Sequence, residues 1–199
     1  MADLSTLLPS GTVRLLTHFL LDPEARLHLR ALHRRTGLGM GALQRELARL
    51  ESLGLIRAVR DDGRVHHEMV HEHPSWKALL ILVREHADPA QVAAAAMQEV
   101  DGIIAAFVFG STARGEAVTE SDLDILLVDD GSTRLATLGR AILQTESLLA
   151  RPIDLKRYTP ATLAQALREG SGFLKAVLAG PKAWIVGSEP IIARLRAAA

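Results

Sequence analysis

Three aspartates in the second half of the sequence have the types and spacing of a metal-binding catalytic site. Asp122 and Asp124 stand at the head of a strand-like run, and alternation places both carboxylates on one face of that strand. Two carboxylates placed in this way can hold a pair of divalent cations about 4 Å apart. Asp154, between Ile153 and Leu155 in a short apolar run, is the candidate for a third carboxylate from a neighbouring strand.

A Gly-Ser pair precedes these aspartates. The apolar run 103–109 has the length of a buried strand and leads directly into Gly110 and Ser111, and ten residues separate Ser111 from Asp122. Glycine lets the backbone approach a phosphate closely, and serine adds a hydroxyl and an exposed N–H. A phosphate site opposite a two-metal site suits transfer from a nucleoside triphosphate, because the metals offset charge on the attacking and leaving oxygens.

Each motif alone has an ordinary structural explanation. A Gly-Ser pair is usually a turn, and an Asp-x-Asp pair is usually a solvated loop or a helix cap. The prediction of a site depends on the two motifs, the two strands and the later Ile-Asp-Leu triplet occurring together.

The segment GSTARGE followed by SDLDILL resembles the Gly-Ser, ten-residue gap, Asp-x-Asp signature of the minimal nucleotidyltransferases of the polymerase-β type. The resemblance covers roughly residues 100–190. It implies Mg²⁺ (or Mn²⁺) as the metal and a nucleoside triphosphate, which we expect to be ATP, as the substrate. The residues it implies are Asp122, Asp124 and Asp154 for the metal, Gly110 and Ser111 for the triphosphate, and Arg114 for the loop or the phosphates.

The acceptor of the nucleotide stays open at the level of sequence. The family that the segment resembles includes antitoxins that transfer AMP to a partner toxin and enzymes that modify aminoglycosides. The resemblance implies that Asp154 could also take the proton of the acceptor hydroxyl. Lys156 and Arg157 follow it and could contact phosphate or acceptor, but a solvated strand end is the interpretation that we favour.

The first half of the sequence is rich in arginine. Between Arg26 and His67 nine arginines stand against four acidic residues, a local surplus of five in a chain whose formal net charge is zero. The predicted elements are a helix at 12–21, a short strand at 26–29, a helix at 30–36, a long helix at 40–52 and a hairpin at 55–70 around Asp61-Asp62-Gly63. This order resembles the winged helix-turn-helix of bacterial regulators over roughly residues 11–73.

A winged helix implies a double-stranded DNA partner and a homodimer that reads two half-sites. If Leu43, Leu47 and Leu50 of the long helix face the core, its polar side chains point outward to the major groove, where Gln pairs with adenine and Arg with guanine. The hairpin would contact phosphate or the minor groove. The candidate DNA-binding residues are Gln44, Arg45, Arg49, Arg57, Arg60 and Arg64.

Two alternatives to DNA recognition exist for the first half of the sequence. Winged helices also act as protein-interaction modules, so DNA is favoured only because the long helix and the hairpin are basic together. His66, His67, His71 and His73 invite a metal-sensor interpretation, but we favour histidines on a wet surface of the hairpin.

The fold class predicted from these patterns is α/β (α+β), with a winged helix-turn-helix followed by a nucleotidyltransferase domain whose mixed sheet is flanked by helices. The expected divisions are 1–73, a helical connector at 74–100, and 101–199. No cysteine is present, which removes disulfides and thiolate metal sites and fits a cytoplasmic protein. We expect neither a membrane span nor a signal peptide.

Two functions follow. The chain is either a DNA-binding regulator with a Mg²⁺-dependent nucleotidyltransferase that transfers NMP to a hydroxyl, or a transcriptional regulator whose nucleotidyltransferase-like domain only senses nucleotide or binds a partner. A role as an antitoxin acting on a partner toxin is a further possibility.

Overall fold

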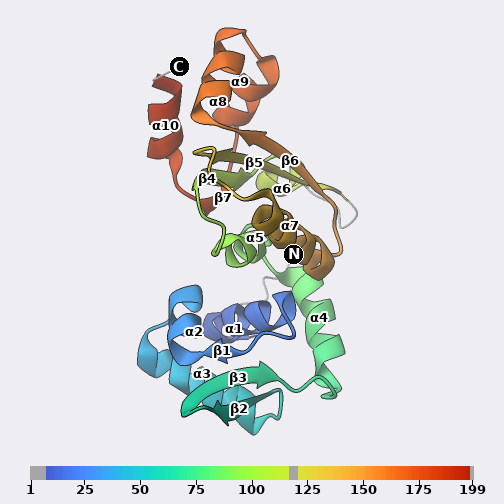
Figure 1. The fold of residues 1–199 in the computed structure, drawn as a ribbon. Helices are drawn as coiled ribbons and strands as arrows, with labels where there is room; N and C mark the ends of the chain where they lie inside the picture. Colours follow the sequence, from blue (N-terminus) through green and yellow to red (C-terminus); the bar gives the residue numbers. More distant parts are fainter. Residues whose placement is uncertain (1–7, 117–120, 198–199) are drawn as a thin grey trace. The chain divides into compact units, whose positions relative to one another are not determined.

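The computed structural model describes residues 8–116 and 121–197. The chain divides into two compact units, residues 1–88 and 89–199 (Figure 1). This division lies inside the 74–100 stretch in which the sequence placed the connector. Residues 117–120 of the Gly-Ser to Asp-x-Asp segment lie outside the described residues.

The N-terminal unit combines helices with a three-stranded antiparallel sheet in the order β1-β3-β2. Its core gathers large apolar side chains from every helix and strand of the unit, among them Phe19, Leu32, Leu43, Ile56 and Trp76. Its elements are α1 (Ser10–Leu21), β1 (Leu27–His28), α2 (Leu29–Thr36), α3 (Met40–Ser52), β2 (Ile56–Asp61), β3 (Arg64–Met69) and α4 (Ser75–His86).

The element order predicted for residues 12–70 is therefore present, and local chemistry explains it. Asp62 and Gly63 form the two-residue turn between β2 and β3 with φ of 45° and 75°. Positive φ at both positions gives the turn the twist of the flanking strands. Helix α3 ends at Ser52, as predicted, and Leu53, which follows it, is 55% exposed.

The C-terminal unit is a mixed α/β unit, which confirms the predicted mixed sheet flanked by helices. Its four strands have the order β6-β5-β4-β7, with β4 antiparallel to β5 and β7, and β5 parallel to β6. Its elements are α5 (Pro89–Met97), β4 (Ile103–Val108), α6 (Gly110–Arg114), β5 (Leu123–Asp129), α7 (Leu135–Leu149), β6 (Ile153–Tyr158), α8 (Pro160–Arg168), α9 (Gly172–Ala179), β7 (Ala183–Val186) and α10 (Glu189–Ala197).

Helices cover both faces of this sheet (Figure 1). Phe107 of β4 and Leu126 and Val128 of β5 pack against α8, α9 and α10 through Leu163, Leu174 and Ile192. Because side chains alternate along a strand, Asp124 lies on the same face of β5 as Leu126. Helices α5 and α7 lie on the other side of the sheet. The aspartates thus belong to the face covered by α8, α9 and α10.

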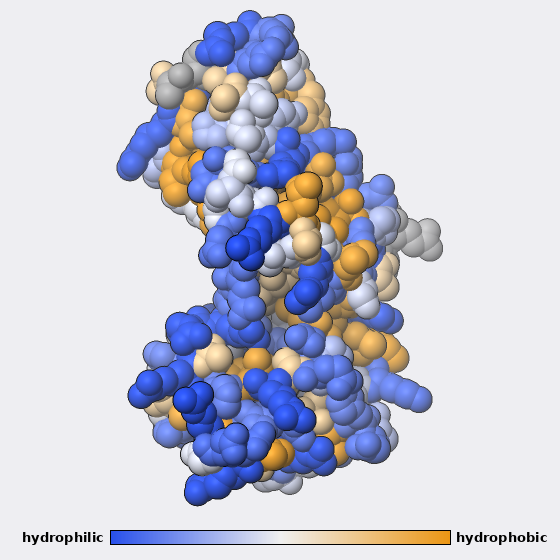
Figure 2. Space-filling view, viewed as in Figure 1, coloured by the Kyte–Doolittle hydropathy of each residue, from blue (hydrophilic) through white to orange (hydrophobic). Residues whose placement is uncertain are grey.

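Surface polarity is uneven in the view of Figure 2, where hydrophilic side chains dominate the N-terminal unit and apolar ones gather over part of the C-terminal unit. No helix within the described ranges 8–116 and 121–197 is long and apolar enough to cross a membrane.

Candidate functional site

The parallel pairing of β5 with β6 brings two of the three aspartates side by side. Asp124 and Asp154 are direct register partners, so their side chains project from the same face of the sheet. Asp122 precedes β5 by one residue and is exposed, while Asp124 is half-buried. We call Asp122, Asp124 and Asp154 the carboxylate cluster. The sequence predicted the third acid on a neighbouring strand, and the pairing of the strands places it there.

Gly110 lies directly against this cluster. Its φ is +71°, and a Cβ built on it would come within 2.2 Å of Asp124 Oδ2, so no other residue fits without moving that carboxylate. The main chain is fixed at the same point, because the Phe109 N–H donates to the Asp124 carbonyl over 3.0 Å. Gly110 also begins the short helix α6. Gly110 and Asp124 therefore pack directly against each other.

The electrostatics of the cluster are those of crowded acids. Burial raises the pKa of Asp124 above its ordinary value, and the neighbouring carboxylates of Asp154 and Asp122 raise it further. Lys156 lies two residues after Asp154 on β6 and donates to Asp154 Oδ1 over 2.8 Å. This bond raises the pKa of Lys156. The Lys156 side chain is partly exposed, as predicted for a solvated strand end, and it also pairs with a member of the cluster.

Arg157 has a different role. Its guanidinium is bound bidentately by Asp129, a fully buried carboxylate at the end of β5, with N–O distances of 2.5 and 3.1 Å. Asp129 also accepts from the Gly131 N–H over 2.8 Å. The Arg157 hydrogen bond is the main cause that lowers the pKa of Asp129. Arg157 thus serves a structural ion pair rather than the carboxylate cluster.

Arg151 was missed in the sequence and lies next to the cluster. Its guanidinium donates to the Ser121 and Asp122 carbonyls and to the Thr112 hydroxyl, over 2.7, 3.2 and 3.0 Å. No motif marked this residue. The one available signal was a cationic side chain directly before the Pro-Ile-Asp-Leu segment that carries Asp154.

The residues of the cluster fit a divalent cation by their donor chemistry. Carboxylate oxygens are the ligands that Mg²⁺ and Mn²⁺ prefer. Burial is the main cause that raises the pKa of Asp124, and the neighbouring acids add a repulsion that a bound cation would relieve. Within the part of the chain that the structure describes, however, no three His, Asp or Glu side chains already converge as ligands of one metal ion.

A hollow of about 240 Å³ lies between the start of α6 and the end of α9. Gly110 forms part of its wall, so the hollow adjoins the carboxylate cluster. Arg114 reaches it from α6 and is held by Glu116 through a 2.6 Å bond. Apart from Arg114, its walls are apolar side chains and backbone. The lining residues are Phe109, Gly110, Arg114, Ala176, Val177, Gly180 and Pro181.

The side chains proposed for DNA contact are exposed, as expected for a binding surface. Gln44, Arg45 and Arg49 of α3 face solvent while Leu43, Leu47 and Leu50 are buried. On the hairpin, Arg57 is not free: its guanidinium binds Glu68 with N–O distances of 2.6 and 2.7 Å. The exposed candidates are Gln44, Arg45 and Arg49 on α3, and Arg57, Arg60 and Arg64 on β2 and β3.

The prediction of histidines on a wet surface is wrong for His66 and His67 of β3, whereas His71 is exposed. His66 and His67 are only 3% and 8% exposed. His67 lies 3.3 Å from Glu51 of α3, and burial is the main cause that lowers its pKa. His66 lies 3.4 Å from Glu68 on the outer side of the sheet. β3 is the central strand of its sheet, so β1 and β2 flank it on both sides.

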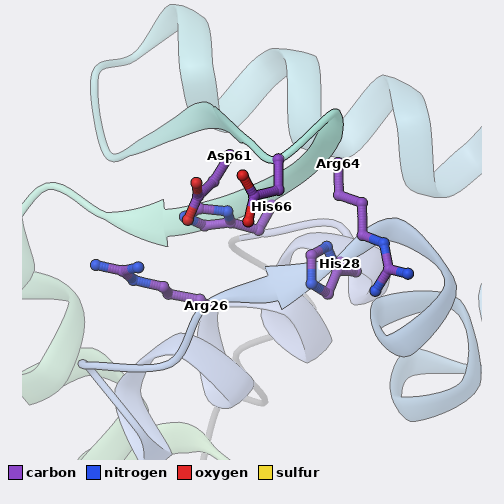
Figure 3. A pocket seen from close by; sticks show the side chains of 6 residues that line it. Arg26, His28, Asp61, Arg64 and His66 are labelled. Carbon is purple, nitrogen blue, oxygen red and sulfur yellow. The ribbon is translucent and has the colours of Figure 1, made fainter.

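A second hollow, of about 410 Å³, opens on that outer side (Figure 3). The guanidinium groups of Arg26 and Arg64 point away from each other across it. Since acids also line it, the charges do not converge on one phosphate. Its lining residues are Arg26, His28, Asp61, Asp62, Arg64 and His66.

The comparison with protein families agrees with the position of the carboxylate cluster. Residues 91–175 match the model of the nucleotidyltransferase domain, a stretch that includes Gly110, Ser111 and all three aspartates. No curated protein matches the chain.

Proposed function

We propose that the C-terminal unit is a divalent-metal-dependent nucleotidyltransferase that transfers NMP from a nucleoside triphosphate to a hydroxyl acceptor. The observation that carries the proposal is the packing of Gly110 against Asp124, whose register partner is Asp154. A glycine that approaches a carboxylate pair this closely brings a phosphate-accessible backbone next to metal ligands. The nucleotidyltransferase domain match over residues 91–175 supports the same chemistry.

Each residue then has a role. Asp122, Asp124 and Asp154 hold Mg²⁺ or Mn²⁺, which when bound offsets charge on the attacking and leaving oxygens. Gly110 and Ser111 hold the triphosphate, and the hollow beside Arg114 receives the nucleoside, which we expect to be adenosine. The acceptor oxygen attacks the α-phosphorus, the bond to pyrophosphate breaks, and Asp154 takes the acceptor's proton.

Transfer can be tested without knowing the acceptor. The full chain is incubated with ATP labelled on the α-phosphate, Mg²⁺ and a cell lysate, beside the Asp122→Ala/Asp124→Ala variant. We expect label to appear in a protein, nucleic acid or small molecule with the wild type only. Absence of transfer by the wild type with each of the four nucleoside triphosphates would overturn the proposed activity.

We further propose that the N-terminal unit is a winged helix that binds double-stranded DNA as a homodimer. Support comes from the helix, strand and hairpin order and from the exposed Gln44, Arg45 and Arg49 on α3. Arg45→Ala should weaken binding to a selected DNA site more than binding to random DNA, because a base contact specifies sequence. Equal loss on both kinds of DNA would contradict base readout by Arg45.

Two further roles use the same site differently. A regulator that senses nucleotide would bind the triphosphate without any transfer, which the labelled lysate separates from catalysis. An antitoxin would label one protein, its partner toxin, whose gene we expect beside the gene of this chain. An acceptor that is not a protein would exclude the antitoxin role.

A further inference from the structure

Arg151 lies outside the motif, in the connection between α7 and β6, and its main chain is firmly held there. Its own N–H donates to the Glu146 carbonyl over 3.3 Å. The Ile153 N–H donates to the Glu146 carboxylate over 2.8 Å, which fixes the chain on the other side of Arg151. The main chain at Arg151 is therefore fixed, and the side chain extends from it at the edge of the carboxylate cluster.

The guanidinium joins two separate segments of the site. Nε donates to the Ser121 carbonyl, and one Nη donates both to the Asp122 carbonyl and to the Thr112 hydroxyl. Ser121 and Asp122 lead into β5, while Thr112 belongs to α6, two residues after Gly110. A planar fork with several fixed donors is what allows one side chain to bind acceptors on two segments.

The positive charge of Arg151 also faces the acids. Burial lowers the pKa of Arg151, but the carboxylates of Asp122 and Asp124 act in the opposite direction. A guanidinium stays protonated in proteins, so a full positive charge remains beside two carboxylates. This charge offsets part of their mutual repulsion.

We propose that Arg151 is a positioning residue of the nucleotide site: it ties α6 to the start of β5 and so keeps Gly110 and Ser111 in register with Asp122 and Asp124. This inference rests on the proposed nucleotidyltransferase function. Arg151 acts through Thr112 and the Asp122 main chain: Nε and one Nη of its guanidinium bind protein acceptors. Its loss therefore loosens the arrangement of the site without removing a metal ligand.

The test compares Arg151→Met and Arg151→Lys in the full chain, with Arg140→Met as the control, because Arg140 is an exposed arginine of the neighbouring helix α7. Mn²⁺-dependent ATP affinity and amide hydrogen exchange of the nucleotide-free protein are measured. Two amides report on the tie: Glu116 N–H, bonded to Ser111 O, and Leu123 N–H, bonded to Pro152 O.

We expect Arg151→Met to weaken ATP binding by about tenfold, the scale of one charge-assisted hydrogen bond. Exchange of the Glu116 and Leu123 amides should quicken, while the core of the unit stays protected. Arg151→Lys should restore part of the affinity through its charge, but little of the protection. Thr112→Val should weaken binding less, and its effect should not add to that of Arg151→Met, because both remove the same contact.

Unchanged exchange at both amides in Arg151→Met would overturn the positioning role, whatever happens to ATP. Equal loss of protection throughout the unit would also overturn it, since Arg151 would then be a general stability residue. If the wild type binds no nucleotide but the two amides still quicken in Arg151→Met, the structural tie stands and the proposed function fails.

Discussion

At the scale of single residues, the contact between Gly110 and Asp124 is the most restrictive feature of the site. Two glycines of this segment have nearly the same left-handed backbone, Gly110 with φ of 71° and Gly115 with φ of 73°. Of the two, Gly110 has a neighbour in the way of a Cβ, whereas no atom of the described residues lies within 4 Å of a Cβ at Gly115. Comparing substitutions at the two glycines therefore separates the cost of backbone strain from the cost of displacing the Asp124 carboxylate.

Gly110→Ala should therefore lose nucleotide binding and transfer by more than about tenfold, because the methyl group displaces Asp124. Gly115→Ala should keep nucleotide binding and lose only about 1 kcal/mol of stability through its left-handed backbone. ATP titration and thermal unfolding of both variants provide the measurements. Equal nucleotide affinities in the two variants would show that the contact with Asp124 does not matter for binding.

Asp129 makes a second prediction at the residue scale, concerning stability. Asp129→Asn removes the charge that binds Arg157 and should lower the free energy of unfolding of the C-terminal unit by about 2 kcal/mol at neutral pH. The folded pKa of Asp129 is lowered, so its stabilisation is present above the ordinary pKa of about 4 and is lost as pH falls through the folded value.

The difference between wild type and Asp129→Asn should accordingly shrink in acid. Trp184 of β7 reports on the C-terminal unit when Trp76 is replaced by Phe, so urea unfolding in that background is the measurement. Asp130→Asn is the control, since Asp130 is exposed and its carboxylate accepts from the neighbouring Ser132. A difference that grows as pH falls would contradict the assigned ion pair.

At the scale of elements, α6 and α9 together form the hollow in which we place the nucleoside. Val177→Trp should fill much of this space and weaken ATP binding by about tenfold or more, since the new ring would occupy the space of the base. Lys175→Trp puts the same ring on an exposed position of α9 outside the hollow and should leave binding unchanged. Equal ATP affinities of the two variants would show that the nucleoside does not bind in this hollow.

The hairpin of β2 and β3 makes a prediction about charge. Arg60→Ala should lower the salt dependence of DNA binding by about one unit of slope, as expected when one phosphate contact is lost. Arg57→Ala should change it less, because Glu68 already offsets that guanidinium. DNA affinity measured from low to high salt gives both slopes. A larger change for Arg57 would mean that its pair with Glu68 opens on DNA.

Most elements could be predicted from the sequence because their local signals are strong. Helix α3 has its three leucines at helical spacing, the β2–β3 hairpin has Asp-Gly, and Thr159 forms a capping box with Thr162 at the start of α8. What could not be predicted depends on neighbours distant in the chain. The burial of His66 and His67 follows from β1 completing the sheet beside β3, which no local pattern shows.

At the scale of the whole molecule, the chain joins two compact units whose predicted chemistry differs. The placement of two carboxylates on one strand face was predictable because Asp122, Asp124 and their strand are contiguous in the sequence. For Asp154, only its location on a neighbouring strand was predictable. Its pairing with Asp124 depends on the parallel register of β5 and β6. Arg151 escaped prediction because its importance lies in contacts with Thr112 and Ser121, 39 and 30 residues away.

The most direct measurement of the central claim is equilibrium binding of a non-hydrolysable ATP analogue to the full chain, with and without Mg²⁺. Wild-type protein should bind the analogue only when Mg²⁺ is present, and Asp122→Ala/Asp124→Ala should abolish the Mg²⁺-dependent part. The double variant should keep the fold, since Asp122 is exposed and Asp124 is only half-buried. Metal-independent binding, or equal binding by the double variant, would contradict a metal–nucleotide site at this cluster.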